Sequence, residues 1–205
     1  MSKRYLRRYT DIAALIYLLT EQQITLLDPQ SWDDSNDSYY LKLYRDRKGL
    51  KSVLALCFTQ ASEKYHHWRV FTNGSSGARI RFKRSELLGM IGKKADVRAG
   101  KVEYLRLEEA RLRIPKTEEL PFLKRYPFED ENEFRIIYES KKKIRSLDIP
   151  ISLSCIDEIT LSPWLPEGLF DDIKRLLRSI SGCGRLKIIR STLIGNDEWK
   201  DLAGY

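Results

Sequence analysis

The sequence predicts a single α+β domain, spanning residues 1–205, in which helices flank a mixed and mostly antiparallel sheet. A length of 205 residues suits one compact unit and is short for two. Apolar residues make up 42% of the chain, and its 11 Tyr, 7 Phe and 4 Trp can fill a core without disulfides. The predicted strands outnumber the helices and alternate with them irregularly, which favours α+β over a doubly wound parallel sheet.

The N-terminal quarter predicts one helix and two strands. Asp11 can cap a helix over 12–19, whose apolar residues follow helical spacing. A short strand over 24–27 ends at an Asp-Pro pair, and a polar loop is predicted over 32–37. The almost wholly apolar run 53–58 is typical of a strand that is buried on both faces.

The rest of the chain alternates short helices and strands. An aromatic-rich helix over 65–71 leads through a turn at 73–77 into a strand over 78–82, whose apolar and basic residues point to opposite faces. The same patterns predict a short helix over 85–90, strands over 101–105, 134–138, 156–161 and 186–189, and an amphipathic helix over 169–180. Residues 107–119 are charged and indicate no particular element.

Charge and cysteine content limit the partners and the compartment. The 37 Lys+Arg against 29 Asp+Glu give a net charge of +8, which favours an anionic partner such as nucleic acid or a phosphate-bearing cofactor, or else reflects only a basic surface. Three widely separated cysteines outside any CxxC pair are typical of a reducing cytosol. No stretch is long and apolar enough to span a bilayer, so we expect a cytoplasmic protein without a membrane partner.

Metal sites and the common nucleotide-binding motifs are not predicted. His66 and His67 are adjacent and would face different ways on a helix or a strand, so we expect no metal. The chain has no P-loop, no GxGxxG and no GxSxG, and Gly182-Cys183-Gly184 is too short to cradle a phosphate. Kinase, Rossmann dehydrogenase and α/β-hydrolase functions are therefore excluded.

The acidic segment 129–135 is the most informative stretch. Four carboxylates in five residues repel one another unless water or cations balance them. Glu131 and Glu133 open an apolar strand, where residues two apart point the same way and their titrations couple. The alternative is an exposed loop in which Glu133 pairs with a surface cation.

Three further features are candidates for a site. Arg8 and its neighbours Arg4 and Arg7 lie among tyrosines at the head of the first helix, where guanidinium groups can bind phosphate and Tyr9 can stack a ring; a fraying basic arm is the alternative. The strand 53–58 ends in the hydroxyl of Thr59, either a site residue or a plain strand end. An aromatic wall could form from His67 and Trp68 near Gly77, although an ordinary core role is more frequent for Trp68.

Together these stretches resemble the bacterial family catalogued as domain of unknown function 2971. The resemblance runs nearly end to end and fixes a family without an activity. It rests on Arg8-Tyr9-Thr10, Leu26 through Pro29 with Trp32, Asp34, Asn36 and Asp37, Cys57-Phe58-Thr59, His67-Trp68, Gly77, Pro121-Phe122-Leu123-Lys124 with Glu131, Glu133, Phe134 and Arg135, Leu161-Ser162-Pro163-Trp164, and Arg190-Ser191-Thr192.

A second resemblance is to ADP-ribosyltransferases of the Arg-Ser-Glu type. It implies that Arg8 binds the cofactor phosphate, that Thr59 stands where that group has a serine, and that Glu133 is the catalytic glutamate with Glu131 as its companion. The cofactor would be NAD, whose nicotinamide could stack on Tyr9 or Trp68. The chain departs from the pattern because Cys57-Phe58-Thr59 lacks the usual small hydroxyl triplet and the spacing to Glu133 is long.

The same resemblance implies a biological role. The chain would be a toxin or anti-phage effector that modifies nucleic acid or protein. A cognate antitoxin or defence-system protein would then be its partner.

Two other functions remain open. A non-catalytic nucleic-acid-binding module would use the basic residues Arg79, Arg81, Lys83, Arg84 and Lys141, Lys142 and Lys143, although the last three also suit a solvated loop. A metal-dependent nuclease would use Asp33, Asp34, Asp37, Glu131 and Lys124, although the Asp-then-Glu-x-Lys order of such enzymes is absent.

Overall fold

The computed structural model describes residues 4–204, so Met1–Lys3 and Tyr205 lie outside the described part. The strands are β1 (Tyr5–Asp11), β2 (Gln23–Leu27), β3 (Ser52–Thr59), β4 (Gly77–Lys83), β5 (Val97–Lys101), β6 (Glu103–Leu105), β7 (Leu123–Arg125), β8 (Glu133–Ser140), β9 (Ser146–Pro150), β10 (Ile156–Leu161) and β11 (Ile188–Arg190). The α-helices are α1 (Ile12–Glu21), α2 (Ser35–Arg47), α3 (Tyr65–Phe71), α4 (Arg84–Ile91), α5 (Leu107–Leu112), α6 (Glu167–Ser179) and α7 (Asp197–Asp201). Short 3-10 helices are η2 (Pro29–Ser31), η3 (Gly74–Ser76), η4 (Thr117–Phe122), η5 (Tyr126–Glu131) and η6 (Leu153–Cys155).

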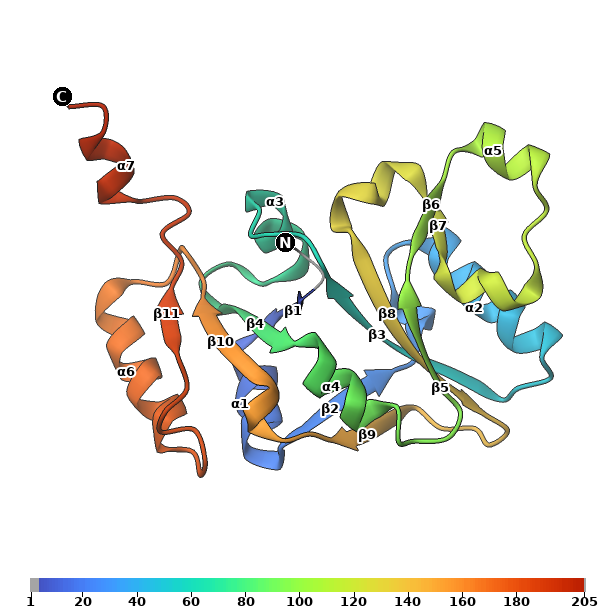
Figure 1. The fold of residues 1–205 in the computed structure, drawn as a ribbon, viewed down its shortest axis with the longest axis horizontal. Coiled ribbons are helices and arrows are strands. Elements are labelled where there is room, and N and C mark those ends of the chain that lie inside the picture. The colour runs from blue at the N-terminus through green and yellow to red at the C-terminus, as the bar shows by residue number, and fades with distance from the viewer. Residues whose placement is uncertain (1–3, 205) are drawn as a thin grey trace.

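The predicted α+β class is confirmed, with one mixed sheet at the centre of the molecule (Figure 1). Its order is β11-β10-β4-β1-β3-β2-β9, and β8 pairs with both β3 and β5. Within this sheet only β10 and β11 run parallel. The strands β6 and β7 form a separate parallel pair. No helix in residues 4–204 is long and apolar enough to cross a bilayer.

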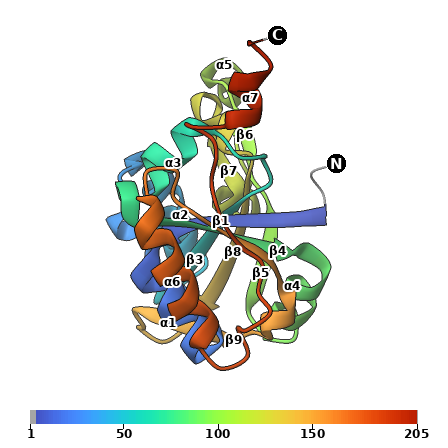
Figure 2. The same ribbon diagram turned by 90° about the vertical axis from the view of Figure 1, so that its left-hand side faces the viewer.

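Helices cover both faces of the sheet, with α1 and α6 on one side and α4 on the other (Figure 2). The main core packs residues of these three helices against the sheet, while a smaller core joins α2 to β3 and β8. Strand β3 contributes to both, because Leu54 and Leu56 lie in the main core whereas Val53 and Ala55 lie in the smaller one. The prediction that this strand is buried on both faces is therefore confirmed.

Local signals explain the elements that agree with the sequence. The carboxylate of Asp11 accepts a hydrogen bond of 2.7 Å from the backbone N–H of Ala14, so it caps α1 as predicted. On β4 the side chains of Ile80 and Phe82 are fully buried in the main core, whereas Arg79 and Arg81 point to the opposite face and bind carboxylates.

Other stretches differ from the sequence prediction. Residues 5–11 form β1 in the middle of the sheet, and not the head of a helix or a frayed arm, because they pair with β4 along their whole length. The loop predicted over 32–37 contains the start of α2, which Asp34 caps by accepting from the N–H groups of Asn36 and Asp37. The strand predicted over 101–105 is divided between β5 and β6, and β9 was not predicted.

The sheet opens where β1 and β3 separate. On one edge β3 pairs with β8 along its full length. On the other edge β3 meets β1 only at Arg7↔Thr59 and β2 only at Leu27↔Ala55. The edge of β3 between these two pairs consequently faces a gap, into which side chains from several elements project.

Candidate functional site

A cavity of about 490 Å³ fills the gap beside β3. A volume of this size lies within the usual range for small-molecule sites. Residues from β1, β2, β3, α3, β7, η5, β8 and the start of α2 line it. Among these are the predicted site residues Arg8, Tyr9, Thr59, Glu131 and Glu133, which are far apart in the sequence.

The side of the cavity formed by β1 is basic. The guanidinium of Arg8 donates to the carbonyl oxygen of Cys57 at 3.4 Å, and that of Arg7 donates to the carbonyl of Gln60 at 3.3 Å. Within residues 4–204 neither arginine forms a salt bridge. Burial lowers the pKa of both, and the charges of nearby arginines lower that of Arg7 further. Two poorly compensated guanidinium groups favour an anionic ligand such as a phosphate.

The opposite side is organised by Arg135, which is completely buried behind the carboxylates that line the cavity. Its guanidinium binds Asp37 through two hydrogen bonds of 2.7 and 2.6 Å and Glu133 through two of 2.7 and 2.9 Å. One remaining N–H donates to the carbonyl of Pro121 at 2.9 Å. All five donors of the guanidinium are thus satisfied, which is what a fully buried charge requires. Arg135 therefore fixes both carboxylates.

Lys124 is the second cation beside these carboxylates. Its ammonium lies 2.7 Å from Glu131, 3.8 Å from Glu133 and Asp37, and 3.9 Å from Asp34. Four carboxyl groups therefore meet two cations. We call this set of six residues the carboxylate cluster.

Burial and charge act against each other on these carboxyl groups. Burial tends to raise the pKa of Glu133, but the charge and hydrogen bonds of Arg135, with Lys124 nearby, outweigh it, so the pKa lies below its usual value. For Glu131 and Asp37 burial prevails over Lys124 and Arg135 respectively, and the pKa of each is raised. Burial tends to lower the pKa of Lys124, yet the charges of Glu133 and Glu131 raise it.

Apolar and aromatic side chains also line the cavity, including Tyr9, Val70, Phe71 and Phe128. Burial raises the pKa of the Tyr9 hydroxyl, although the charge and hydrogen bond of Arg79 oppose the rise. Trp68 is fully buried behind Tyr9, with their ring centres 5.1 Å apart, and donates to the carboxylate of Glu63. The structure therefore places Tyr9 on the cavity and Trp68 in the core that supports it.

Thr59 and Gly77 have structural contacts that the sequence did not reveal. The hydroxyl of Thr59 donates to the carbonyl of Glu131 and accepts from the N–H of Ala61, so it ties η5 to the end of β3. A Cβ on Gly77 would meet the side chain of Thr72 at 2.6 Å, so the close approach at this glycine is to Thr72. Gly77 does not line the cavity.

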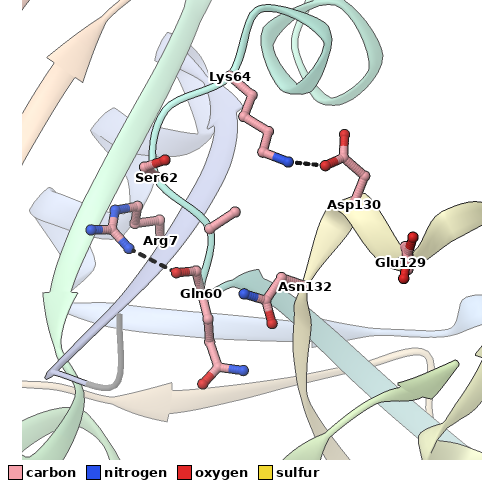
Figure 3. A pocket seen from close by; sticks show the side chains of 8 residues that line it. Arg7, Gln60, Ser62, Lys64, Glu129, Asp130 and Asn132 are labelled. Atoms are coloured by element: carbon pink, nitrogen blue, oxygen red, sulfur yellow. Dashed lines mark hydrogen bonds and ion pairs between the residues drawn. The ribbon is translucent and has the colours of Figure 1, made fainter. Parts of the chain in front are cut away.

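A second cavity, of about 540 Å³, adjoins the first and shares Arg7 with it (Figure 3). Figure 3 shows Lys64 and Asp130 reaching toward each other at its upper rim, where they form an ion pair. The amide side chains of Gln60 and Asn132 lie below this ion pair in the same view. This cavity therefore combines two cations, two carboxylates and two amide groups.

The side chains of His66 and His67 do not face different ways, as their adjacent positions had led us to expect. Both rings approach Asp130: His66 pairs with its carboxylate, and Nε2 of His67 lies 3.1 Å from its carbonyl oxygen. The two side chains therefore do not diverge, although Lys64 already occupies the same carboxylate.

The residues of the nucleic-acid alternative are mostly engaged. Arg79 is buried against Glu63 and Glu158, and Arg81 binds Asp157 and Glu158. Lys83 donates to the carbonyl of Ser154 and pairs with Glu86, and the exposed Lys142 lies in the loop between β8 and β9. These side chains do not form one free basic surface.

The residues of the nuclease alternative do lie together, on the cavity that holds Glu131. However, Arg135 occupies both oxygens of Asp37, and the Lys124 ammonium sits among the carboxylates, where it would repel a metal ion. Metal-dependent cleavage is not favoured by this arrangement.

Two residues at the centre of the site were not predicted in that role. Arg135 follows Glu133 by two positions on β8, and strand periodicity places both side chains on one face. This alternation could have predicted that Arg135 contacts Glu133. Lys124 was assigned only to the nuclease alternative, because its distance from Glu131 depends on how η5 folds back.

Comparison with known proteins supports the fold. No family model matches the chain, and no curated protein matches it. DarT of Thermus sp. 2.9 in complex with ADP-ribosylated single-stranded DNA has a TM-score of 0.50 at 10% identity, covering 93% of this chain and 95% of that chain. DarT structures with NAD+ and with carba-NAD+ give TM-scores of 0.48 and 0.47 at 11% and 10% identity, each covering 92% of this chain and 95% of that chain. The first likeness shows a shared fold, while the resemblance to domain of unknown function 2971 stays a prediction.

Proposed function

We propose that this chain is an NAD-dependent ADP-ribosyltransferase whose acceptor is nucleic acid. The observation that carries the proposal is the polarity of one cavity. Arg7 and Arg8 reach the cavity from β1 on one side of β3 and form no salt bridge within residues 4–204, whereas Glu131 and Glu133 reach it from η5 and β8 on the other side.

NAD+ has the matching charge distribution. Its pyrophosphate is anionic and would bind Arg7 and Arg8, while its nicotinamide ring is cationic and would face the carboxylate cluster. Tyr9 lines the cavity beside these arginines and would contact the ring. The residues present therefore fit this substrate.

The carboxylates suit cleavage of the nicotinamide–ribose bond. When that bond breaks, its electron pair leaves on nicotinamide and positive charge develops on the ribosyl carbon, which Glu133 stabilises electrostatically. A new bond then forms between this carbon and the acceptor nucleophile. The acceptor's proton passes to Glu131, so atoms and charges balance.

Nucleic acid is supported as the acceptor by two observations. The structure that shares this fold with a TM-score of 0.50 holds ADP-ribosylated single-stranded DNA. The net charge of +8 also favours an anionic macromolecule. With such an acceptor the chain would act in the cytoplasm as a toxin or anti-phage effector, and a cognate antitoxin would restrain it.

The test is transfer of radiolabelled ADP-ribose from NAD+ to a mixed pool of single-stranded DNA, with lysate proteins as a parallel acceptor. We expect wild type to label the DNA and E133Q to lose about 100-fold or more of the rate. E158Q is the matched control, since Glu158 is similarly buried on β10, pairs with Arg81 at 3.0 Å and does not line the cavity. Labelling of protein alone would overturn the proposal that nucleic acid is the acceptor. Equal labelling by E133Q and wild type would remove Glu133, and no labelling by wild type would refute the function.

A further inference from the structure

We propose that Lys124 is a positioning residue that favours the ionised form of Glu131 against burial and keeps it on the cavity, where it takes the acceptor's proton. The inference rests on the proposed function and deepens it. It assigns separate tasks to the two glutamates and adds a residue to which the resemblance to ADP-ribosyltransferases gives no role.

The two glutamates are held in different ways. Both oxygens of Glu133 accept hydrogen bonds from Arg135, and its side chain is 5% exposed. A carboxylate bound so completely is suited to stabilising charge and poorly suited to accepting a proton. Glu131 has a single side-chain partner within the described chain, the Lys124 ammonium, which binds only its Oε2. Its other oxygen is left for the acceptor.

Lys124 is also the only cation that reaches Glu131 and Asp34 within residues 4–204. The carbonyl of Glu131 is fixed separately by the Thr59 hydroxyl. The main chain and the carboxylate of Glu131 therefore have independent anchors. Lys124 itself is held in place by the ring of Phe128, 4.5 Å from the ammonium.

Removal of the ammonium would change the chemistry of Glu131. Its carboxylate would then face Glu133 and Asp37 in a largely buried site with no cation of its own. Like charges and burial both favour the protonated form. A protonated Glu131 cannot act as the base.

The first test measures the titration of Glu131 directly, by NMR of carboxyl carbon-13 in labelled glutamate, with E131Q to assign the signal. In K124M we expect the titration to move to higher pH by about one unit or more, and in K124R to stay near that of wild type. K187M is the matched control, because Lys187 binds the buried Glu158 at 2.7 Å elsewhere. An unmoved titration in K124M would overturn the inference. If K124M does not fold, K124Q provides the same comparison.

The second test separates positioning from a general structural effect by comparing transfer to single-stranded DNA with NAD+ hydrolysis. Hydrolysis needs Glu133 but no proton transfer from that acceptor, so K124M should lose about 10- to 100-fold in transfer and less in hydrolysis. The acid limb of its pH–rate profile should move to higher pH, and K124R should restore it. Equal loss of both reactions with an unmoved pH profile would contradict the assignment. A wild type without either reaction would refute the proposed function, while the NMR titration would still decide the link between Lys124 and Glu131.

Discussion

Arg135 is the residue on which the geometry of the site depends most. It joins Asp37 of α2 to Glu133 of β8 through four hydrogen bonds, entirely out of contact with water. A buried ion pair of this kind contributes little net stability over an apolar replacement, but loss of one partner leaves uncompensated charge. Arg135 therefore acts mainly by fixing the carboxylates where the cavity needs them.

We expect R135M to lose about 3–5 kcal/mol of unfolding free energy at neutral pH, as measured by urea denaturation. The loss should shrink on acidification, because protonation removes the unpaired charges of Asp37 and Glu133. R81M should lose less, since Arg81 is partly exposed, water can reach Asp157, and Lys187 still pairs with the buried Glu158. Equal losses in the two variants would contradict the central role of Arg135.

His67 makes stability depend on pH. Burial, with smaller contributions from His66 and Lys64, lowers the pKa of its imidazole to about 4. An unfolded chain binds this proton near pH 6.5, so the free energy of unfolding falls as pH drops from about 6.5 toward 4.

We expect H67Q to abolish about 2 kcal/mol of this pH-dependent loss. Urea denaturation at several pH values measures it. H66Q is the control: it retains the buried imidazole of His67 and should retain most of the pH dependence of the free energy of unfolding. A wild-type slope retained in H67Q would show that His67 is not its source.

At the scale of elements, the site depends on how η5 is attached to the end of β3. Thr59 makes this attachment through its hydroxyl, which binds the carbonyl of Glu131 and the N–H of Ala61. The structure thus gives the hydroxyl a role in holding the segment that carries Glu131. A direct contact with substrate is not needed to explain it.

We expect T59V to reduce ADP-ribose transfer about 10-fold or more, because the isosteric valine cannot anchor η5. T59S retains the hydroxyl and should retain most of the activity. Initial rates on single-stranded DNA measure both. Full activity in T59V would show that the hydroxyl is dispensable.

The elements also show what the sequence can and cannot predict. Periodicity and capping identified α1, β3, β4 and α6, where each residue pattern reflects its own burial. The strand β1 was not predicted because the consecutive arginines at 7 and 8 conceal the alternation of apolar and polar residues. Both arginines line the cavity because β1 separates from β3 after a single residue pair. Helix α2 was missed because its start is polar: Asp34 caps it and Asp37 binds the buried Arg135.

The site itself was predictable by residue type more than by geometry. Strand alternation relates Glu133 to Arg135, and the order of Arg8, Thr59 and Glu133 named three residues that line one cavity. The ion pair of Lys124 with Glu131 depends on the path of η5, which local patterns do not determine.

At the scale of the whole molecule, the sheet positions opposite charges on the two sides of one cavity. β1 brings the arginines to one side of the gap, while β7, β8 and α2 bring the carboxylate cluster to the other. Such a division of charge over a cavity of about 490 Å³ orients a ligand that is itself anionic at one end and cationic at the other. The helix α7 projects away from this region and does not line the cavity (Figure 1).

The most direct measurement is a crystal structure of E133Q grown with NAD+, in which slow turnover preserves the substrate. We predict that the pyrophosphate lies against Arg7 and Arg8 and that the nicotinamide end lies beside Glu131 and Tyr9. NAD+ bound in the reverse orientation, bound elsewhere, or absent at millimolar concentration would contradict the account.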